Sequence, residues 1–179
     1  MHHTLRFYGR YRESILRFYM FGARMTRIPV AGHLVRYIAN RFGEKGEGAY
    51  LLTPAEAEAI VAAAGGLAVS PCTCRKVFHN CGNPLNTELL LGHSREAFMA
   101  ERPQENKEIS REAALQIVRD AHKRGLVQTV IKCGHHFYAL CNCCACCCVP
   151  LRMKRDYGIG KAVIRHKDIV AEFKARTAE

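Results

Sequence analysis

Six cysteines occupy one eight-residue stretch, residues 141–148, which reads Cys-Asn-Cys-Cys-Ala-Cys-Cys-Cys. Thiolates held this close repel one another unless a metal ion or an inorganic cluster takes up their charge. Thiolate is also the soft ligand that zinc, copper(I) and iron–sulfur clusters prefer. This stretch therefore constrains the fold more than any other feature, because the rest of the chain must bring further ligands and a protected pocket to it.

Four more cysteines lie outside this stretch. Three of them follow the spacing C-x-C-x6-C between Pro71 and Pro84, and the tenth stands alone: Cys72, Cys74, Cys81 and Cys133. Thiols on loops rich in Pro and Gly are typical of cluster pockets, where free backbone amides can hydrogen-bond to sulfur. Ten cysteines suffice for two clusters with four thiolates each.

The six-cysteine run can serve two centres at once. If it is extended, alternate side chains face opposite sides. This predicts Cys141, Cys143 and Cys147 on one side and Cys144, Cys146 and Cys148 on the other.

Length and composition indicate one globular domain. The chain has 179 residues, of which 49% are hydrophobic and 24% charged, so it can bury a core. It opens on an arginine-rich stretch that does not resemble a signal peptide. Its longest apolar region, residues 49–69, contains glutamates, Pro54 and a Gly-Gly pair, so no membrane span is expected. We expect a cytoplasmic protein with reduced cysteines, which points to metal or redox chemistry and not to structural disulfides.

The net charge of +11 is concentrated at the N-terminus, where residues 1–43 hold eight arginines and one acidic residue, Glu13. Residues 1–27 are predicted to form a basic amphipathic helix with Phe and Tyr on one side and Arg on another. The aromatic face either packs on the domain or a second subunit, or the helix docks on an acidic redox partner protein or peripherally on an anionic membrane surface. Nucleic acid is disfavoured as a partner, because the rings and the arginines face different ways.

Residues 28–179 are predicted to form the cluster-binding domain. Helices are expected over 31–42, from the capping box Thr53-Pro54-Ala55-Glu56, and from Ser110 to Gly125. Residues 44–48 read as a linker. Strands over 126–131 and 137–140, joined by a turn at 132–136, predict a hairpin that leads into the six thiols. The fold class is therefore α+β: a small, mainly helical domain with a short β-hairpin leading into a cysteine-rich pocket.

Other thiolate chemistries compete with an iron–sulfur cluster. Four-thiolate zinc sites usually show two separated C-x2-4-C pairs, which this sequence lacks. A metallothionein-like zinc or copper store matches the local spacing, but such chains have no core. Thiol redox without a metal is a further alternative. His135 and His136 are weaker ligand candidates, and positive charge on Arg75 and Lys132 beside the thiols would offset the negative charge of a cluster.

The motifs resemble a known group of proteins. Residues 71–76, Pro-Cys-Thr-Cys-Arg-Lys, and above all the string from Leu140 through Cys148 to Arg152 resemble uncharacterised ferredoxin-like iron–sulfur (4Fe-4S) proteins of bacteria and archaea. The resemblance covers about residues 28–174 and matches the stand-alone form, which lacks the C-terminal ferredoxin module. It implies iron–sulfur binding and one-electron transfer. Longer members often have another cysteine after the Pro that here is Pro84. Glu88 is the candidate for that place, so Glu88 or Cys133 would complete the first ligand group.

The sequence thus predicts one or two 4Fe-4S clusters held in a pocket by the ten cysteines, with Glu88 as a further candidate metal ligand. The predicted function is one-electron transfer between protein partners. No catalytic residues and no small-molecule substrate are indicated, and whether the protein is an enzyme stays open. Two other classes compete: an iron–sulfur or redox sensor, and a zinc or copper storage or structural site. The cofactor-binding candidates are Cys72, Cys74, Cys81, Cys133, Cys141, Cys143, Cys144, Cys146, Cys147 and Cys148.

Overall fold

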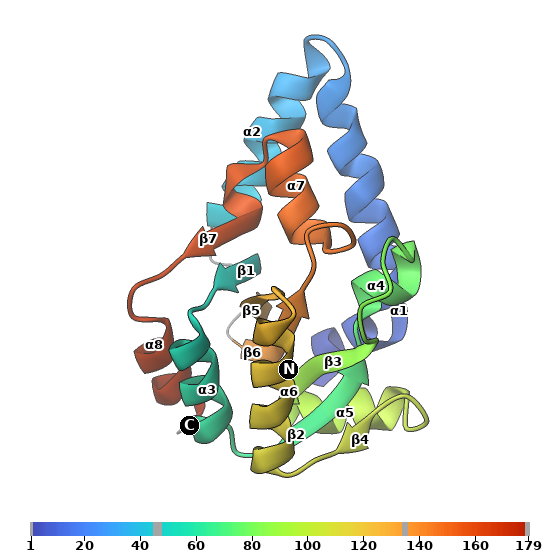
Figure 1. The fold of residues 1–179 in the computed structure, drawn as a ribbon. Helices are drawn as coiled ribbons and strands as arrows, with labels where there is room; N and C mark the ends of the chain where they lie inside the picture. Colours follow the sequence, from blue (N-terminus) through green and yellow to red (C-terminus); the bar gives the residue numbers. More distant parts are fainter. Residues whose placement is uncertain (1, 45–47, 134–135, 178–179) are drawn as a thin grey trace.

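The computed structural model describes residues 2–44, 48–133 and 136–177. In these residues eight α-helices surround one seven-stranded mixed sheet (Figure 1). The predicted α+β class is confirmed. None of the described helices combines the length and apolar character needed to cross a bilayer.

The sheet has the strand order β4-β2-β3-β6-β5-β1-β7. All neighbouring strands pair antiparallel except β1 and β7, which are parallel. The central strand β6 carries the first cysteines of the run between β3 and β5. The strands are β1 (Gly48–Leu51), β2 (Leu67–Pro71), β3 (Asn86–Leu91), β4 (Lys107–Glu108), β5 (Val127–Cys133), β6 (His136–Cys143) and β7 (Val163–Arg165).

Helices cover both faces of the sheet (Figure 1). They are α1 (His2–Arg24), α2 (Ala31–Glu44), α3 (Pro54–Ala63), α4 (Thr73–Phe78), α5 (His93–Glu101), α6 (Arg111–Lys123), α7 (Val149–Tyr157) and α8 (Ile169–Thr177), with 3-10 turns η1 (Met25–Arg27) and η2 (Gly160–Ala162). On one face Leu89 and Leu140 pack with α3, α6 and α8. On the other face Leu90 and Ala139 pack with α1 and α5. Adjacent strand residues thus point to opposite cores, as the period of two requires.

Local sequence signals fix several helix ends. Thr53 accepts a hydrogen bond from the Glu56 backbone N–H while the Glu56 carboxylate accepts one from the Thr53 N–H, which confirms the capping box. Ser110 caps α6 in the same way through the Ala113 N–H. The predicted hairpin is formed by β5 and β6. Residues 134–135 of its turn, and 45–47 of the expected linker, lie outside the described residues.

Helix α1 buries a face that the sequence did not suggest. Leu5, Gly9, Leu16 and Met20 are buried, and so is the side chain of Arg12. These positions recur every three or four residues and form one stripe. On the aromatic side, Phe7 and Phe18 are exposed, whereas Tyr8 packs against Phe98 and Tyr138, so only part of this side contacts the domain. Gly9 faces the Phe98 ring, and its lack of a side chain lets α1 lie close to α5. The predicted boundary at residue 27 falls in the turn between α1 and α2.

Candidate metal centre

The six-cysteine run changes conformation in its middle. It is extended up to Cys143, where β6 ends, then turns over residues 145–147 and enters α7 at Val149. The predicted alternation is correct for Cys141, Cys143, Cys144 and Cys146, but Cys147 and Cys148 exchange sides. Because of the turn, Cys147 lies with Cys144 and Cys146, and Cys148 lies with Cys143. The run still divides its thiols between two places.

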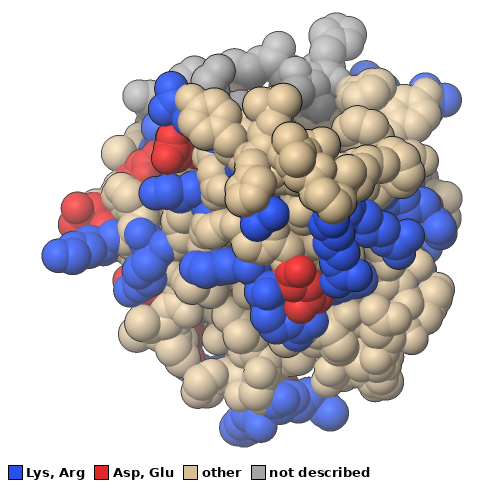
Figure 2. All heavy atoms as spheres, turned by 90° about the horizontal axis from the view of Figure 1, so that it is seen from above, with Lys and Arg blue, Asp and Glu red and all other residues tan. Residues whose placement is uncertain are grey.

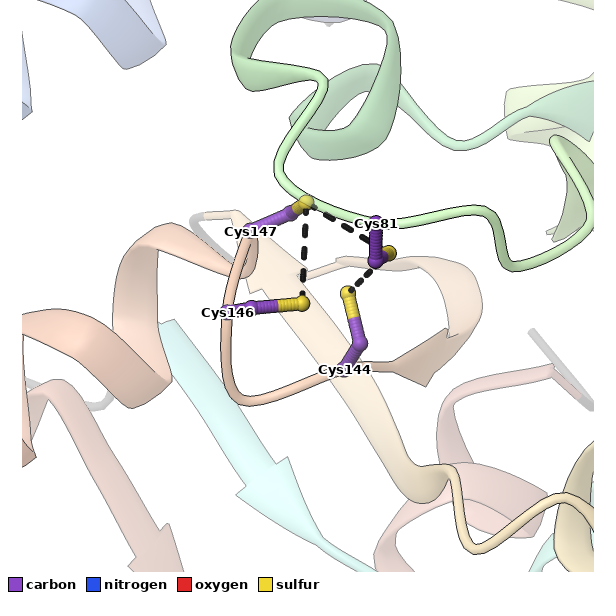
Figure 3. Close-up of side chains that lie close together, drawn as sticks. All are labelled: Cys81, Cys144, Cys146 and Cys147. Carbon is purple, nitrogen blue, oxygen red and sulfur yellow. Dashed lines mark hydrogen bonds between the residues drawn. The ribbon is translucent and has the colours of Figure 1, made fainter.

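The first group, which we call the outer set, consists of Cys81 and the three cysteines of the turn, Cys144, Cys146 and Cys147 (Figure 3). Its four sulfurs all lie within 4.8 Å of one another. Cys81 Sγ is 3.7 Å from the sulfurs of Cys144 and Cys147, and Cys146 Sγ is 3.9 Å from that of Cys147. A tetrahedral ion with metal–sulfur bonds of about 2.3 Å separates its thiolates by about 3.8 Å. The outer set can therefore hold a metal.

Amide side chains support the outer set from the loop after α4. Asn83 Nδ2 donates to Cys81 Sγ at 3.4 Å, and Asn80 Nδ2 donates to the Cys146 carbonyl at 2.8 Å. Burial alone would raise the pKa of Cys81, but hydrogen bonds from Asn83 and the neighbouring thiols outweigh it and lower that pKa to about 6. Cys81 is thus ready to bind a metal as thiolate at neutral pH, whereas burial raises the pKa of Cys147.

The second group, the pocket set, lines a cavity of about 520 Å³ between the sheet, α1, α2 and α7. The cavity wall is mostly apolar, and six cysteines line it. Five of them form the pocket set: Cys72, Cys74, Cys141, Cys143 and Cys148. Within this set, Cys72, Cys143 and Cys148 are buried, and the other two are half-buried. The sixth cysteine of the cavity wall is Cys133, which lies at the other end of the β5–β6 hairpin from Cys143.

Two helix starts position the pocket set. The segment after Cys72, expected as a loop, forms α4, with Cys72 as its N-cap and Cys74 in its first turn. Cys148 is likewise the N-cap of α7, and the Val149 backbone N–H donates to Cys74 Sγ at 3.5 Å. Helix N-termini favour negative charge, but the pKa of both cap thiols is nevertheless raised, chiefly by burial at Cys72 and by hydrogen bonds with the thiols of Cys143 and Cys74 at Cys148.

Inside the pocket set, one sulfur collects the hydrogen bonds. The thiols of Cys141 and Cys148 and the hydroxyl of Thr129, 3.5 Å away, surround Cys143 and hold its pKa well below the ordinary value. Burial and the charge of neighbouring thiols raise the pKa of Cys72. The protein therefore stabilises one thiolate here by itself, and a bound metal would have to supply the charge that ionises the others.

Arg75 connects the two sets. Its buried guanidinium donates to the carbonyls of Pro84 and Asn142 and to Thr87 Oγ1 at 2.9 Å. Burial lowers the pKa of Arg75, but negative charge on Cys72, Cys144 and Cys143 outweighs this and raises it. The sequence-based expectation that Arg75 places positive charge beside the thiols agrees with this geometry.

Asn142 fixes the run between its neighbouring strands. Its buried side chain donates from Nδ2 to the Thr87 carbonyl at 2.8 Å and accepts at Oδ1 from Gln128 Nε2 at 3.3 Å. The amide therefore ties β6 to both β3 and β5. Sequence reasoning passed over this residue, although a single polar side chain among thiols was a usable signal.

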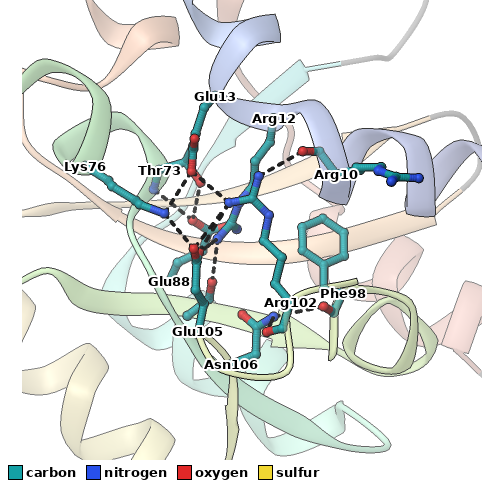
Figure 4. A network of polar contacts seen from close by, with 11 residues as sticks. Arg10, Arg12, Glu13, Thr73, Lys76, Glu88, Phe98, Arg102, Glu105 and Asn106 are labelled. Carbon is teal, nitrogen blue, oxygen red and sulfur yellow. Dashed lines mark hydrogen bonds and ion pairs between the residues drawn. The ribbon is translucent and has the colours of Figure 1, made fainter. Parts of the chain in front are cut away.

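Glu88 lies beside Cys141 across the β3–β6 ladder and lines the same cavity. Its carboxylate accepts hydrogen bonds from the Thr73 N–H at 3.3 Å and from Arg12 Nη1 at 3.5 Å (Figure 4). Arg12 also donates to Ser70 Oγ at 3.1 Å. The Glu88 oxygens are thus engaged with α1 and with the start of α4, and sequence reasoning missed Arg12 as their partner.

The remaining candidates lie toward the other end of the hairpin from Cys143. Cys133 pairs with His136 there, about 20 Å from Cys143 along the strands, and lines the same cavity as the pocket set. Lys132 also lines this cavity and pairs with Glu172 at 2.9 Å. His136 opens β6 at that end, and His135 lies outside the described residues.

Known proteins supply no assignment for this site. Compared with family models, curated proteins and solved structures, the chain gives no significant match in any of the three comparisons.

Proposed function

We propose that the protein is an iron–sulfur protein that carries single electrons between protein partners. The observation that carries the proposal is the division of one cysteine run between two thiol sets. Each set is completed by cysteines from the segment 72–81. Nine of the ten cysteines are used in this way, which is more than a single structural ion requires.

The residues present fit such a group chemically. The outer set offers four thiols, and the pocket set offers five around a cavity with room beyond the sulfurs. The Val149 N–H beside Cys74 and the amide of Asn83 beside Cys81 are the kind of hydrogen bonds to sulfur that tune reduction potential. Bound iron–sulfur clusters would supply one-electron chemistry; the chain supplies ligands, burial and the positive charge of Arg75.

The arrangement of the two sets suits electron transfer. Cys143 and Cys144 are adjacent in sequence but belong to different sets, and the same is true of Cys147 and Cys148. Two centres would therefore lie close together. Cys81 and Cys146 are part-exposed, so a partner protein could approach the outer set, while the pocket set stays covered.

A second candidate applies to the outer set alone. Its sulfur separations of 3.7–3.9 Å match four thiolates around one tetrahedral ion. Zinc bound there would be structural, and the pocket set would then be the redox centre. In this arrangement the protein would still carry electrons, but with one cluster in place of two.

The test is the content of iron, zinc and acid-labile sulfide per chain in protein purified without oxygen, with electron paramagnetic resonance before and after dithionite. About eight irons with matching sulfide would support two cubanes. About four irons, matching sulfide and one zinc would support the mixed arrangement. Zinc or copper without sulfide, and no signal on reduction, would refute the electron carrier and favour storage or structure.

A sensor would behave differently from a carrier. If the cluster served regulation, its loss or oxidation would change binding to another macromolecule. Reversible one-electron reduction, with no such change, supports the carrier. Salt-dependent DNA binding that follows cluster state would support the sensor instead.

A further inference from the structure

Helices α1 and α2 form a hairpin that exposes many apolar side chains. In the described residues, eleven of the thirteen exposed large hydrophobic side chains lie between residues 7 and 42. Those near the turn are Phe18, Phe21, Ile28, Val30, Leu34 and Ile38, of which Phe18 and Ile38 also line the cavity of the pocket set. Single exposed hydrophobics need no explanation, but a continuous group on one projection marks a binding surface.

The apolar stripe of α1 lies opposite its buried stripe. Phe18 is 69% exposed, while Leu16 and Met20, about half a turn away, are buried. The helix therefore has two apolar sides, and the structure packs only one of them among the described residues. The side of an amphipathic helix that always faces water is normally polar, so the exposed aromatic side chains of α1 indicate a partner that covers them.

Val30 strengthens this inference. It lies at the tip of the hairpin, is 87% exposed and has a φ of 64°. A β-branched side chain in the left-handed region is strained, and here no packing within the described chain compensates. Asparagine or glycine would suit the backbone better. The apolar side chain is therefore explained by a contact outside the chain.

Positive charge surrounds the apolar tip. Arg17, Arg24 and Arg27 are exposed and form no ion pair with the described residues. In the view onto the apex, uncharged side chains form a continuous area bordered mainly by Lys and Arg (Figure 2). A second copy docked tip to tip would bring like charges together, whereas an anionic lipid surface complements them.

We propose that the α1–α2 hairpin docks the protein peripherally on an anionic bilayer, with the side chains around Phe21, Val30 and Leu34 inserted at the headgroup boundary and the arginines on lipid phosphates. Insertion of a helical tip needs no membrane span. The proposal rests on the exposed side chains of the hairpin and stands whether or not the thiol sets hold iron. The hairpin projects from the body of the molecule (Figure 1).

The experiment is flotation of the full chain with vesicles of phosphatidylcholine alone or with about one-third phosphatidylglycerol. We expect binding to the anionic vesicles. Val30→Asn combined with Leu34→Gln should weaken it at least tenfold, because apolar burial is lost. Arg17→Gln combined with Arg24→Gln should weaken it roughly thirtyfold at low salt. Leu85→Asn, at an exposed apolar residue away from the hairpin, is the matched control and should bind normally.

Insertion itself can be observed with one fluorophore, because the chain contains no Trp. The emission of Phe21→Trp should shift to the blue on anionic vesicles, and that of Leu85→Trp should not. Equal binding to neutral vesicles, or none to either, would overturn the proposal; self-association lost in Val30→Asn would reassign the tip to a second copy. Iron and sulfide measured on the same samples keep this result separate from the function proposed above.

Discussion

The outer set and the pocket set draw on the same six-cysteine run but place their thiols in different surroundings. The outer set is compact, part-exposed and supported by the amides of Asn80 and Asn83. The pocket set is spread around a cavity, largely buried, and held by helix starts and by Arg75. The outer set thus has the dimensions of a site for one metal ion, whereas the pocket set surrounds a cavity with room for a larger group. Neighbouring cysteines can serve different chemistry when a strand ends between them.

Removing one ligand from each set should have the largest effect. Cys143→Ser should empty the pocket set and Cys147→Ser the outer set. The free energy of metal binding at a site with four thiolates is about 10–16 kcal/mol. Removing one of the four ligands should therefore weaken the affinity roughly a hundredfold. Metal retained after dialysis against a chelator measures this. Cys133→Ser is the comparison variant. Cys133 lines the same cavity but lies about 20 Å from Cys143 along the strands, so we expect this variant to retain its metal. Normal metal content in Cys143→Ser and Cys147→Ser would disprove the division.

Replacing the residue shared by both sets tests whether they are independent. Arg75→Met removes three hydrogen bonds and leaves the buried carbonyl of Asn142 without this donor. We expect the free energy of unfolding to fall by about 3 kcal/mol, measured by urea denaturation of the metal-free protein. Arg119→Met, which breaks an exposed pair with Glu58, should change it by less than about 1 kcal/mol. A change in Arg75→Met no larger than in this control would mean that the guanidinium does not join the sets.

Thiol reactivity should separate the sets without any metal. In reduced, metal-free protein, Cys81, with a pKa of about 6, should be alkylated by iodoacetamide at pH 7 ahead of the buried pocket thiols. Asn83→Ala removes the side-chain hydrogen bond to this sulfur and should slow the reaction by about twofold, because a thiol about ten times less acidic would still be about half ionised at pH 7. Peptide mass mapping over time gives the rates. Faster labelling of Cys72 than of Cys81 would contradict the assigned environments.

Acidification should weaken the contact between α1 and α4, and this is the smallest of the expected effects. Hydrogen bonds from Lys76 and Arg102 lower the pKa of Glu13 from 4.5 to about 2 and tie α1 to α4 (Figure 4). Because the folded pKa lies below the unfolded one, this stabilisation is present above about pH 4.5 and is lost as the pH falls towards 2. The pairs are part-exposed, so the contribution is below about 1 kcal/mol. Urea denaturation of wild type and Glu13→Gln should differ at pH 6 and converge near pH 2; a constant difference would exclude this linkage.

Local signals predicted the frame of the molecule. The Thr53 capping box, the Ser110 cap and the β5–β6 hairpin depend on residues within a few positions of each other. The short helices α4 and α7 were missed, because each begins at a cysteine, Cys72 or Cys148, which is not a usual cap.

Features that depend on contacts between distant parts of the chain could not be predicted from the sequence. Arg12 is buried because Glu88 and Ser70, far away in the chain, receive its guanidinium. Likewise the positions of Cys147 and Cys148 depend on a turn that α7 and the loop carrying Cys81 hold in place. A period of two is reliable only while the strand continues, so the predicted alternation is wrong for Cys147 and Cys148, which follow the turn.

The turn at residues 145–147 fixes which cysteines of the run face the outer set and which face the pocket set. Adding or deleting one residue there would shift every later thiol by one position, so that Cys148 would take the place of an outer ligand or the reverse. A substitution removes one ligand, but such a shift would mix both sets at once. The number of residues in the run therefore decides which cysteine enters which set, and this length matters to both sites as much as the sulfur atoms do.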